Sequence, residues 1–269
     1  MATGCGDVSG RQQRSPAVVL RVRPVRESDL MLVLLTRERG RIDAVARGAR
    51  RSRRRFPGGL AVGQRGVATL ASGRGDVWRL DEFECEGDHG AIGRDLERFA
   101  YVAYVCEVAE ALISGTEPDD RAFALIDDAI RELVDDRPHP AVLRSVELRL
   151  LDTLGLAPAL TTCAVCRTAL PLSAVSEVAF DHRRGGALCR LHAAGARPVD
   201  TATIEAAAQL LVVDRPRAFV DGLSRPERRS VRDLCLAAIH HHVARPLRSA
   251  GFFASLALPP DDPRSPSQS

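Results

Sequence analysis

The spacing of apolar residues changes from strand-like to helical near residue 95, and this change constrains the fold more than any other feature of the chain. Before it, short apolar runs without helical periodicity lie at 17–22, 30–35, 42–46, 66–71 and 77–85. Gly40 stands between the second and third runs, where a hairpin turn needs a positive φ. Five short strands in about seventy residues fit a small closed barrel better than a βαβ unit. We therefore expect a five-stranded β-barrel of the OB type.

The second half of the chain carries helical patterns. Apolar residues recur at spacings of three and four in two sets: Leu96, Phe99, Ala103 and Cys106, and then Phe123, Ile126, Ile130, Leu133 and Val134. Pro140 marks the start of a third helix and Gly155 its C-terminal cap. A short apolar helix is predicted at 203–213, and Ser224 with Glu227 has the spacing of a capping box before a last helix.

These patterns predict an α+β chain with several domains, in which an N-terminal OB-type β-barrel precedes an α-helical domain. The expected boundaries are a disordered tail at 1–16, an OB-type barrel domain at 17–88, a helical domain at 92–258 and a disordered tail at 259–269. The first residues lack the apolar stretch of a secretory signal, and no run is long enough to cross a membrane.

Two pairs of metal-binding residues interrupt the helical half. Cys163 and Cys166 form a C-x-x-C pair, and after a gap of 22 residues Cys189 and His192 form a C-x-x-H pair. Each pair turns tightly enough to present both of its ligands to one tetrahedral ion, and four such ligands leave no open coordination position. We therefore expect a structural Zn²⁺ site in a knuckle inserted at about 160–195.

Other interpretations of the cysteines stay open. The two pairs could be coincidental, or Cys163 and Cys166 could be a redox pair, although a thioredoxin-like motif needs a βαβ setting. His182 lies in the gap and competes with His192 as a ligand candidate. Seven cysteines at irregular spacing argue against a secreted disulfide framework and favour a reducing cytoplasm.

The basic residues are unevenly distributed, and apart from histidine every one of them is arginine. Residues 1–80 carry 17 Arg and 6 acidic residues, a net charge of +11, whereas residues 81–269 carry 21 Arg and 29 acidic residues, a net charge of −8. The formal charge of +3 for the whole chain conceals this difference. Such asymmetry is typical of a polyanion-binding module joined to a second domain.

The densest positive charge lies on a predicted loop, where six arginines occupy the nine positions from Arg47 to Arg55. Like charges at this density repel one another unless an anion lies between them. The alternative is a solvated or disordered basic loop, but nucleic acid accounts better for so many charges of one sign. Phe56 could stack on a base, although burial is favoured. The predicted DNA-binding residues are Arg41, Arg47, Arg50, Arg51, Arg53, Arg54 and Arg55.

No catalytic constellation is recognisable, so we expect a protein that is not an enzyme. The chain has no lysine for a phosphate-binding loop, no zinc-deaminase signature and no nucleophile elbow. Three successive histidines, His240, His241 and His242, lie on a predicted helix, where neighbouring side chains point in different directions. We interpret them as a solvated helix end.

Four stretches together resemble the RecO family of bacterial recombination and repair proteins. They are 47–51 with Phe56, 154–158 leading to the first cysteine pair, 180–189 with its two glycines, and 242–249. The chain differs from the family pattern at His192, where a fourth cysteine is common, and in its exclusive use of arginine.

The resemblance implies an OB domain, a helical domain and a zinc knuckle. It also implies that the protein binds single- and double-stranded DNA and anneals complementary strands. With RecR and RecF, such a protein helps RecA replace single-strand binding protein, whose acidic C-terminal tail contacts the helical domain. The implied location is the cytoplasm, at the nucleoid. Two other functions stay open: a general single-strand DNA- or RNA-binding OB protein without a recombination role, and a redox enzyme that uses Cys163 and Cys166.

Overall fold

The chain is represented by a computed structural model that describes residues 12–73, 75–87, 90–249 and 253. The described residues divide into two compact units. The barrel unit comprises the residues up to Gly90 together with Ser114–Phe123, and the helical unit comprises Ala91–Ile113 and the residues from Ala124 onward. Residues 1–11 of the tail predicted at 1–16, and the whole tail predicted at 259–269, lie outside the described residues.

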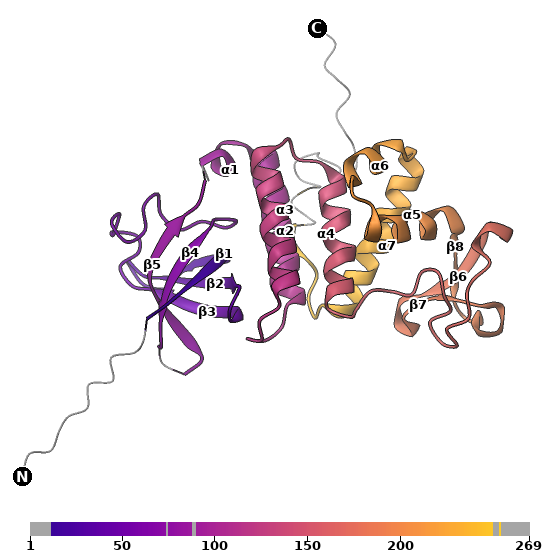
Figure 1. Ribbon diagram of the computed structural model, residues 1–269, viewed down its shortest axis with the longest axis horizontal. Helices are drawn as coiled ribbons and strands as arrows, with labels where there is room; N and C mark the ends of the chain where they lie inside the picture. The colour runs from indigo at the N-terminus through magenta and orange to yellow at the C-terminus, as the bar shows by residue number, and fades with distance from the viewer. Residues whose placement is uncertain (1–11, 74, 88–89, 250–252, 254–269) are drawn as a thin grey trace, which may run out of the picture. The chain divides into compact units, whose positions relative to one another are not determined.

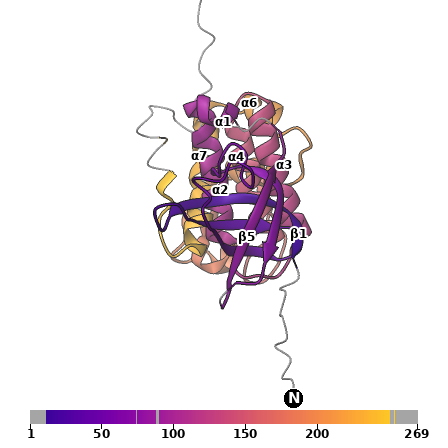
Figure 2. The ribbon, with the colours of Figure 1, turned by 90° about the vertical axis from the view of Figure 1, so that its left-hand side faces the viewer.

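Five strands form a closed barrel in the order β1-β2-β3-β5-β4, with β4 paired back onto β1 (Figures 1 and 2). Their bounds are β1 Gln13–Pro24, β2 Leu30–Thr36, β3 Gly40–Ala46, β4 Arg65–Ala71 and β5 Val77–Cys85. All neighbouring strands are antiparallel except β3 and β5, which are parallel. The predicted five-stranded OB-type barrel is confirmed. The predicted end of the N-terminal tail at residue 16 is wrong, because β1 begins at Gln13 and pairs with β4 from that residue.

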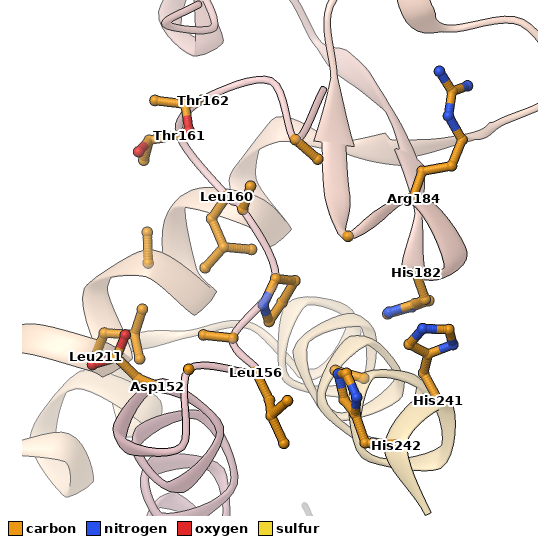
Figure 3. A pocket seen from close by; sticks show the side chains of 18 of the residues that line it. Asp152, Leu156, Leu160, Thr161, Thr162, His182, Arg184, Leu211, His241 and His242 are labelled. Atoms are coloured by element: carbon orange, nitrogen blue, oxygen red, sulfur yellow. The ribbon is translucent and has the colours of Figure 1, made fainter. Parts of the chain in front are cut away.

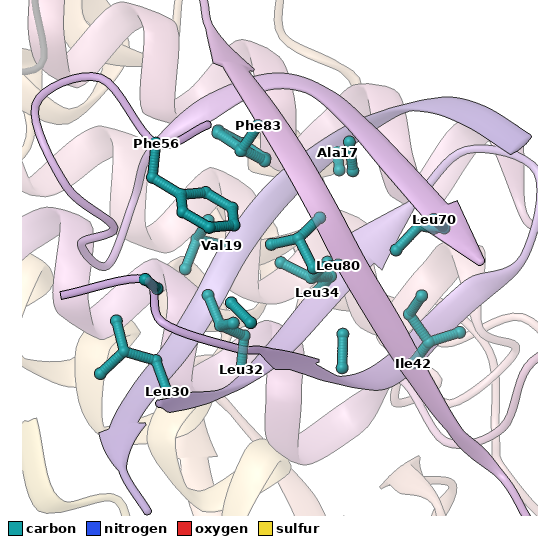
Figure 4. Packing of buried hydrophobic residues seen from close by; sticks show 14 residues of the cluster. Ala17, Val19, Leu30, Leu32, Leu34, Ile42, Phe56, Leu70, Leu80 and Phe83 are labelled. Atoms are coloured by element: carbon teal, nitrogen blue, oxygen red, sulfur yellow. The ribbon is translucent and has the colours of Figure 1, made fainter. Parts of the chain in front are cut away.

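Alternating side chains from all five strands fill the barrel (Figure 4). Its core includes Ala17, Val19, Leu32, Leu34, Ile42, Ala44, Ala68, Leu70, Leu80 and Phe83. Phe56 joins this core from the loop between β3 and β4 and is only 1% exposed. The favoured interpretation of Phe56 as a buried anchor is therefore confirmed, and its ring is not available to stack on a base.

A segment from beyond residue 92 returns to the barrel unit. Gly40 has φ +58°, and a Cβ atom there would clash with the backbone carbonyl of Glu117. The guanidinium of Arg37 lies 5.0 Å from the ring centroid of Phe123, and its Nε lies 3.9 Å from Asp120 Oδ1. The predicted positive φ of Gly40 is confirmed. Ser114–Phe123, which the expected boundaries gave to the helical domain, thus packs on the barrel.

Seven α-helices follow the barrel strands in the described chain: α1 Gly90–Arg94, α2 Leu96–Leu112, α3 Asp120–Asp135, α4 Pro140–Thr153, α5 Thr201–Val212, α6 Pro216–Gly222 and α7 Arg225–His242. Gly155 ends α4 with φ +70°, and Ser224 and Glu227 form both bonds of the capping box on α7, as predicted. α1 and α6 were not predicted. No described helix has the length and apolar content needed to span a membrane.

The predicted apolar face of α2 is wrong. Leu96 is 57% exposed and Phe99 is 39% exposed, whereas Cys106 is buried. The buried residues surround most of the helix rather than one stripe: Ala100, Tyr101, Val102, Tyr104, Val105, Cys106, Val108, Ala109 and Leu112. A helix that is buried on several sides has no single apolar stripe to read from its sequence.

A small three-stranded sheet, which the sequence did not predict, lies between α4 and α5 in the chain. Its strands β6 Glu177–Asp181, β7 Gly186–Leu188 and β8 Arg197–Asp200 are ordered β7-β6-β8 and antiparallel. Its apolar side chains join helical residues in a single core that includes Leu160, Val178, Phe180, Ala187, Ile204, Leu210 and Leu234. This shared core fixes the predicted knuckle to the helices.

A buried polar cluster joins α2 and α4. Glu147 accepts hydrogen bonds from the hydroxyl of Tyr104 and from Nη2 of Arg144, the latter at 2.5 Å. None of the three residues is more than 2% exposed. Burial raises the pKa of Tyr104 well above its usual value, and the charge of Glu147 raises it further, so Tyr104 stays a neutral donor.

Glu147→Ala should destabilise the helical unit by about 3–5 kcal/mol, because it leaves the Arg144 charge buried without its carboxylate. The double variant Arg144→Met with Glu147→Leu should recover most of this loss. Urea unfolding followed by circular dichroism measures both. A loss below about 1 kcal/mol for Glu147→Ala would show that water reaches the cluster.

Candidate functional site

The four predicted metal ligands converge in the helical unit. Their ligand atoms all lie within 4.8 Å of one another. Nδ1 of His192 is 3.6 Å from Sγ of Cys163 and 3.2 Å from Sγ of Cys189, and Sγ of Cys166 is 3.8 Å from Sγ of Cys189. His182, the competing candidate, does not belong to this cluster.

Two tight turns present these ligands. In the first turn, the amide of Arg167 donates to the carbonyl of Cys163 at 2.9 Å, and Arg167 has φ +61°. In the second, the amide of His192 donates to the carbonyl of Cys189 at 2.9 Å. Nη1 of Arg184 donates to the carbonyl of His192 at 2.6 Å and holds that turn from outside.

The arrangement fits a tetrahedral ion. Around Zn²⁺, bond lengths of about 2.3 Å to sulfur and about 2.0 Å to nitrogen give edges of about 3.8 Å between two sulfurs and about 3.5 Å between sulfur and nitrogen. The measured separations of 3.8, 3.6 and 3.2 Å match these edges within a few tenths of an ångström. The cluster can therefore hold a metal ion with three thiolates and one imidazole.

The thiols of the cluster differ in acidity. Desolvation raises the pKa of Cys163, but hydrogen bonds from the backbone amides of Cys166, Cys189 and Val165 outweigh it and lower the pKa to about 5. Desolvation instead raises the pKa of Cys189. These hydrogen bonds favour the thiolate form of Cys163, which is the form that binds a metal.

Gly186 brings the two turns together. It has φ +130°, and a Cβ atom would clash with the backbone of Ala159. The amide of Ala159 donates to the carbonyl of Gly185, and the amide of Ala187 donates to the carbonyl of Ala159, each at 2.8 Å. These two hydrogen bonds hold the two backbone segments together. Only glycine allows both the backbone angle and the contact.

Gly186→Ala should destabilise the helical unit by about 2–4 kcal/mol and lower its metal content, because both the φ angle and the contact become strained. Gly195→Ala is the matched control, since Gly195 also has a positive φ, +77°, but a Cβ atom there would meet no other atom within 4 Å. Urea unfolding and metal analysis of the two variants measure the difference. Equal losses would mean that the contact with Ala159 is unimportant.

The arginine-rich loop between β3 and β4 is an ordered part of the barrel unit. Ala49 and Phe56 enter the barrel core. The amide of Gly48 donates to Oδ1 of Asp29 at 2.8 Å, and the amide of Arg50 donates to the carbonyl of Ser28 at 3.1 Å. These contacts hold the loop against the barrel. The alternative interpretation from the sequence, a disordered basic segment, does not fit this arrangement.

Five of the six loop arginines have exposed side chains: Arg47, Arg50, Arg51, Arg53 and Arg54. Arg51 pairs with Glu27, and Arg50 donates to the Glu27 carbonyl at 3.2 Å. Exposed guanidinium groups on a fixed loop can contact phosphates with little loss of backbone entropy.

Arg55 and Arg41 are half-buried. Nη2 of Arg55 donates to the carbonyl of Arg47 at 2.6 Å, Nε donates to Oγ of Ser52 at 3.2 Å, and the guanidinium lies 5.2 Å from the ring centroid of Phe56. Arg55 therefore braces the loop. Sequence reasoning missed Glu27 and Asp29, because contacts about twenty residues apart leave no local pattern.

Comparison with known proteins decides the family. A family model described as "Recombination protein O N terminal" matches residues 11–86, and one described as "Recombination protein O C terminal" matches residues 93–250. The chain belongs to the recombination protein O family, RecO.

Curated relatives agree with this assignment to RecO. A protein of Anaeromyxobacter sp. (strain K) is 36% identical over 239 residues, which cover 87% of this chain and 93% of the relative. A protein of Desulforudis audaxviator (strain MP104C) is 32% identical over 251 residues, which cover 92% of this chain and 98% of the relative. Each of these relatives is called "DNA repair protein RecO". The resemblance stated from the sequence is confirmed.

Proposed function

We propose that the chain is a non-enzymatic DNA-binding mediator of repair and recombination in the RecF pathway. In this proposal it binds single- and double-stranded DNA, anneals complementary strands and helps RecA load onto DNA coated by single-strand binding protein. Membership of the RecO family and the names of its relatives support the repair role. The structural observation that supports DNA binding is the set of exposed arginines on a loop that is hydrogen-bonded to the rest of the barrel.

The proposed DNA contacts are electrostatic. Guanidinium groups that neutralise phosphates release condensed counterions, so binding should depend steeply on salt and little on sequence. We assign phosphate contacts to Arg41, Arg47, Arg50, Arg51, Arg53 and Arg54, and a supporting role to Arg55, whose guanidinium is engaged within the loop. Annealing by such a surface needs only charge neutralisation and transient alignment of the strands, and no nucleotide hydrolysis.

The proposed cofactor is one structural Zn²⁺ ion. Four ligands close its coordination sphere, so the ion would stabilise the knuckle rather than activate water. Cys189 and His192 stand beside Cys163 and Cys166 in the cluster. A redox pair needs only two thiols, so this set of four ligands favours a metal over the redox alternative.

The proposed partners are RecR, RecF, RecA and the acidic C-terminal tail of single-strand binding protein, and the proposed location is the cytoplasm at the nucleoid. We assign DNA binding to the barrel unit and partner contacts to the helical unit, with the knuckle inserted at about 160–195. Membership of the RecO family supports these assignments.

A strand-annealing assay tests the proposal. Complementary oligonucleotides coated with single-strand binding protein should anneal faster when the chain is added, and RecA filaments should form faster on the coated strand when RecR is also present. If neither rate changes while the chain still binds RNA and naked single strands, it is the general OB protein of the alternative function.

A further inference from the structure

A cleft opens in the helical unit beside the knuckle (Figure 3). Its volume is about 740 Å³, within the range of small-molecule sites. The end of α4 and the loop after it, the turn η2 His182–Arg184, α5 and the end of α7 supply its walls. Part of the lining is apolar and includes Leu156, Pro158, Leu160, Ala208, Leu211 and Ala238.

Basic side chains gather at one part of the same cleft. His182 of η2 faces His241 and His242 of α7 (Figure 3). The ring centroids of His241 and His242 are 4.9 Å apart. Arg167, Arg183 and Arg184 also line the cleft, and Asp152 is the one carboxylate among its described lining residues. The prediction of a solvated helix end is therefore only partly right: His241 and His242 are exposed, but both line one cleft.

His182 is the most enclosed of the three histidines. It is half-buried, and its ring centroid lies 4.8 Å from that of Phe180. Desolvation lowers its pKa, the charges of His241 and His242 lower it further, and Asp181 acts in the opposite direction. On its other side, the carboxylates of Glu177, Asp200 and Asp233 line a smaller hollow of about 400 Å³.

Three imidazoles that face one another repel when they gain protons, unless an anion lies between them. A bound anion would reverse this effect, because it favours the charged form of each imidazole. A phosphate group also accepts charge-assisted hydrogen bonds from imidazolium and guanidinium groups. A simple inorganic anion would leave the neighbouring apolar lining uncovered. A ligand that has an apolar part beside its anionic group therefore fits the cleft better.

We propose that this cleft binds a phosphorylated nucleotide, with its phosphate between His182, His241 and Arg183 and its base against Leu156 and Leu211. The ligand is a nucleoside monophosphate or the phosphorylated terminal nucleotide of a DNA strand, since both present the same chemistry. This site is separate from the arginine loop of the barrel, and its occupancy does not depend on DNA binding there.

Thymidine monophosphate, titrated calorimetrically into the full chain, tests the site. Its affinity should rise about tenfold from about pH 8 to about pH 6.5, because the imidazoles gain protons while the phosphate, with a second pKa of about 6, keeps most of its charge. His182→Gln and His241→Gln should each weaken binding about tenfold at the lower pH and reduce the pH dependence. Thymidine, which lacks the phosphate, should also bind about tenfold more weakly.

His240→Gln is the matched control, because His240 lies on the same helix end but does not line the cleft. It should leave the affinity and its pH dependence unchanged. Melting temperatures confirm that each variant is folded, and if His182→Gln does not fold, the exposed His241 still decides the test. Equal affinity of the wild type and His241→Gln at about pH 6.5 would overturn the proposal.

Thymidine oligonucleotides with phosphorylated or hydroxyl ends distinguish the two sources of the ligand. They are tested on the variant Arg47→Ala, Arg50→Ala, Arg53→Ala and Arg54→Ala, in which binding by the barrel is weakened. Tighter binding of phosphorylated ends that His241→Gln abolishes would identify a strand end, and binding of the mononucleotide alone would identify the free form. If the loop substitutions remove mononucleotide binding and the histidine substitutions do not, the nucleotide binds on the barrel and the proposal is wrong.

Discussion

Replacing Arg47, Arg50, Arg53 and Arg54 with alanine is expected to weaken DNA binding about a hundredfold at about 0.1 M salt, similarly for all sequences. These side chains are exposed on a loop that Phe56 and Asp29 hold in place, so their removal should leave the barrel folded. The slope of log affinity against log salt should fall by about 3, because four phosphate contacts fewer release fewer counterions. Fluorescence anisotropy with labelled oligonucleotides across a salt series measures both quantities.

A charge-matched control separates local contacts from net charge. The variant Arg121→Ala, Arg137→Ala, Arg215→Ala and Arg245→Ala removes four exposed arginines from elsewhere in the chain. Its affinity should fall less than about threefold if the loop makes the phosphate contacts. A similar fall in both variants would show that overall charge, not the loop, governs binding. A loss restricted to particular sequences would contradict phosphate-dominated recognition.

Cys163→Ser is expected to abolish metal binding and to destabilise the helical unit, while DNA affinity changes less than about threefold. Cys163 is fully buried among ligands that come from two turns, so its loss leaves the ion with an incomplete tetrahedron. Binding of a structural zinc ion contributes directly to folding, and the urea midpoint should therefore fall. Metal analysis of protein purified without chelator, combined with urea unfolding, measures the effect.

Cys85→Ser provides the comparison for this substitution, because Cys85 is a half-buried free thiol of the barrel outside the ligand cluster. It should keep one bound ion per chain. If Cys163→Ser retains both the metal content and the melting temperature of the wild type, the cluster does not hold a structural ion. A reversible disulfide between Cys163 and Cys166 in a metal-free protein would instead support the redox alternative.

The sequence predicted elements whose pattern is local. The strands of the barrel are short apolar runs separated by turn residues, and α3 carries one clear stripe that includes Ile126 and Ile130, so both followed from the local sequence. The short elements α1, α6 and β6–β8 were missed, because three to seven residues are too few to show a period. The face of α2 was wrong because its surroundings, not its own pattern, determine which residues are buried.

The cluster of four candidate metal ligands was predictable, because the spacing within each pair encodes a tight turn. Only the convergence of the two turns had to come from the fold. The support of the arginine loop was not predictable. Asp29 and Glu27 reach the loop from the turn after β1, and nothing in their local sequence marks that contact. The cleft beside His182 was not predictable either, because its lining residues come from four segments that are far apart in the sequence. The run of three histidines alone does not indicate that these segments meet.

The return of Ser114–Phe123 to the barrel has a consequence for the order of events during synthesis. The ribosome releases the five strands first, but the stretch that packs against Gly40 and Arg37 follows only after the whole of α2 has emerged. The barrel unit can therefore reach its final contacts only when the nascent chain extends beyond Phe123, at which point α2 is complete but α4 and α7, which pack on it, are not. Domains usually mature one after another as they leave the ribosome. Here the first unit can be completed only after residues 91–113 of the second unit have been synthesised.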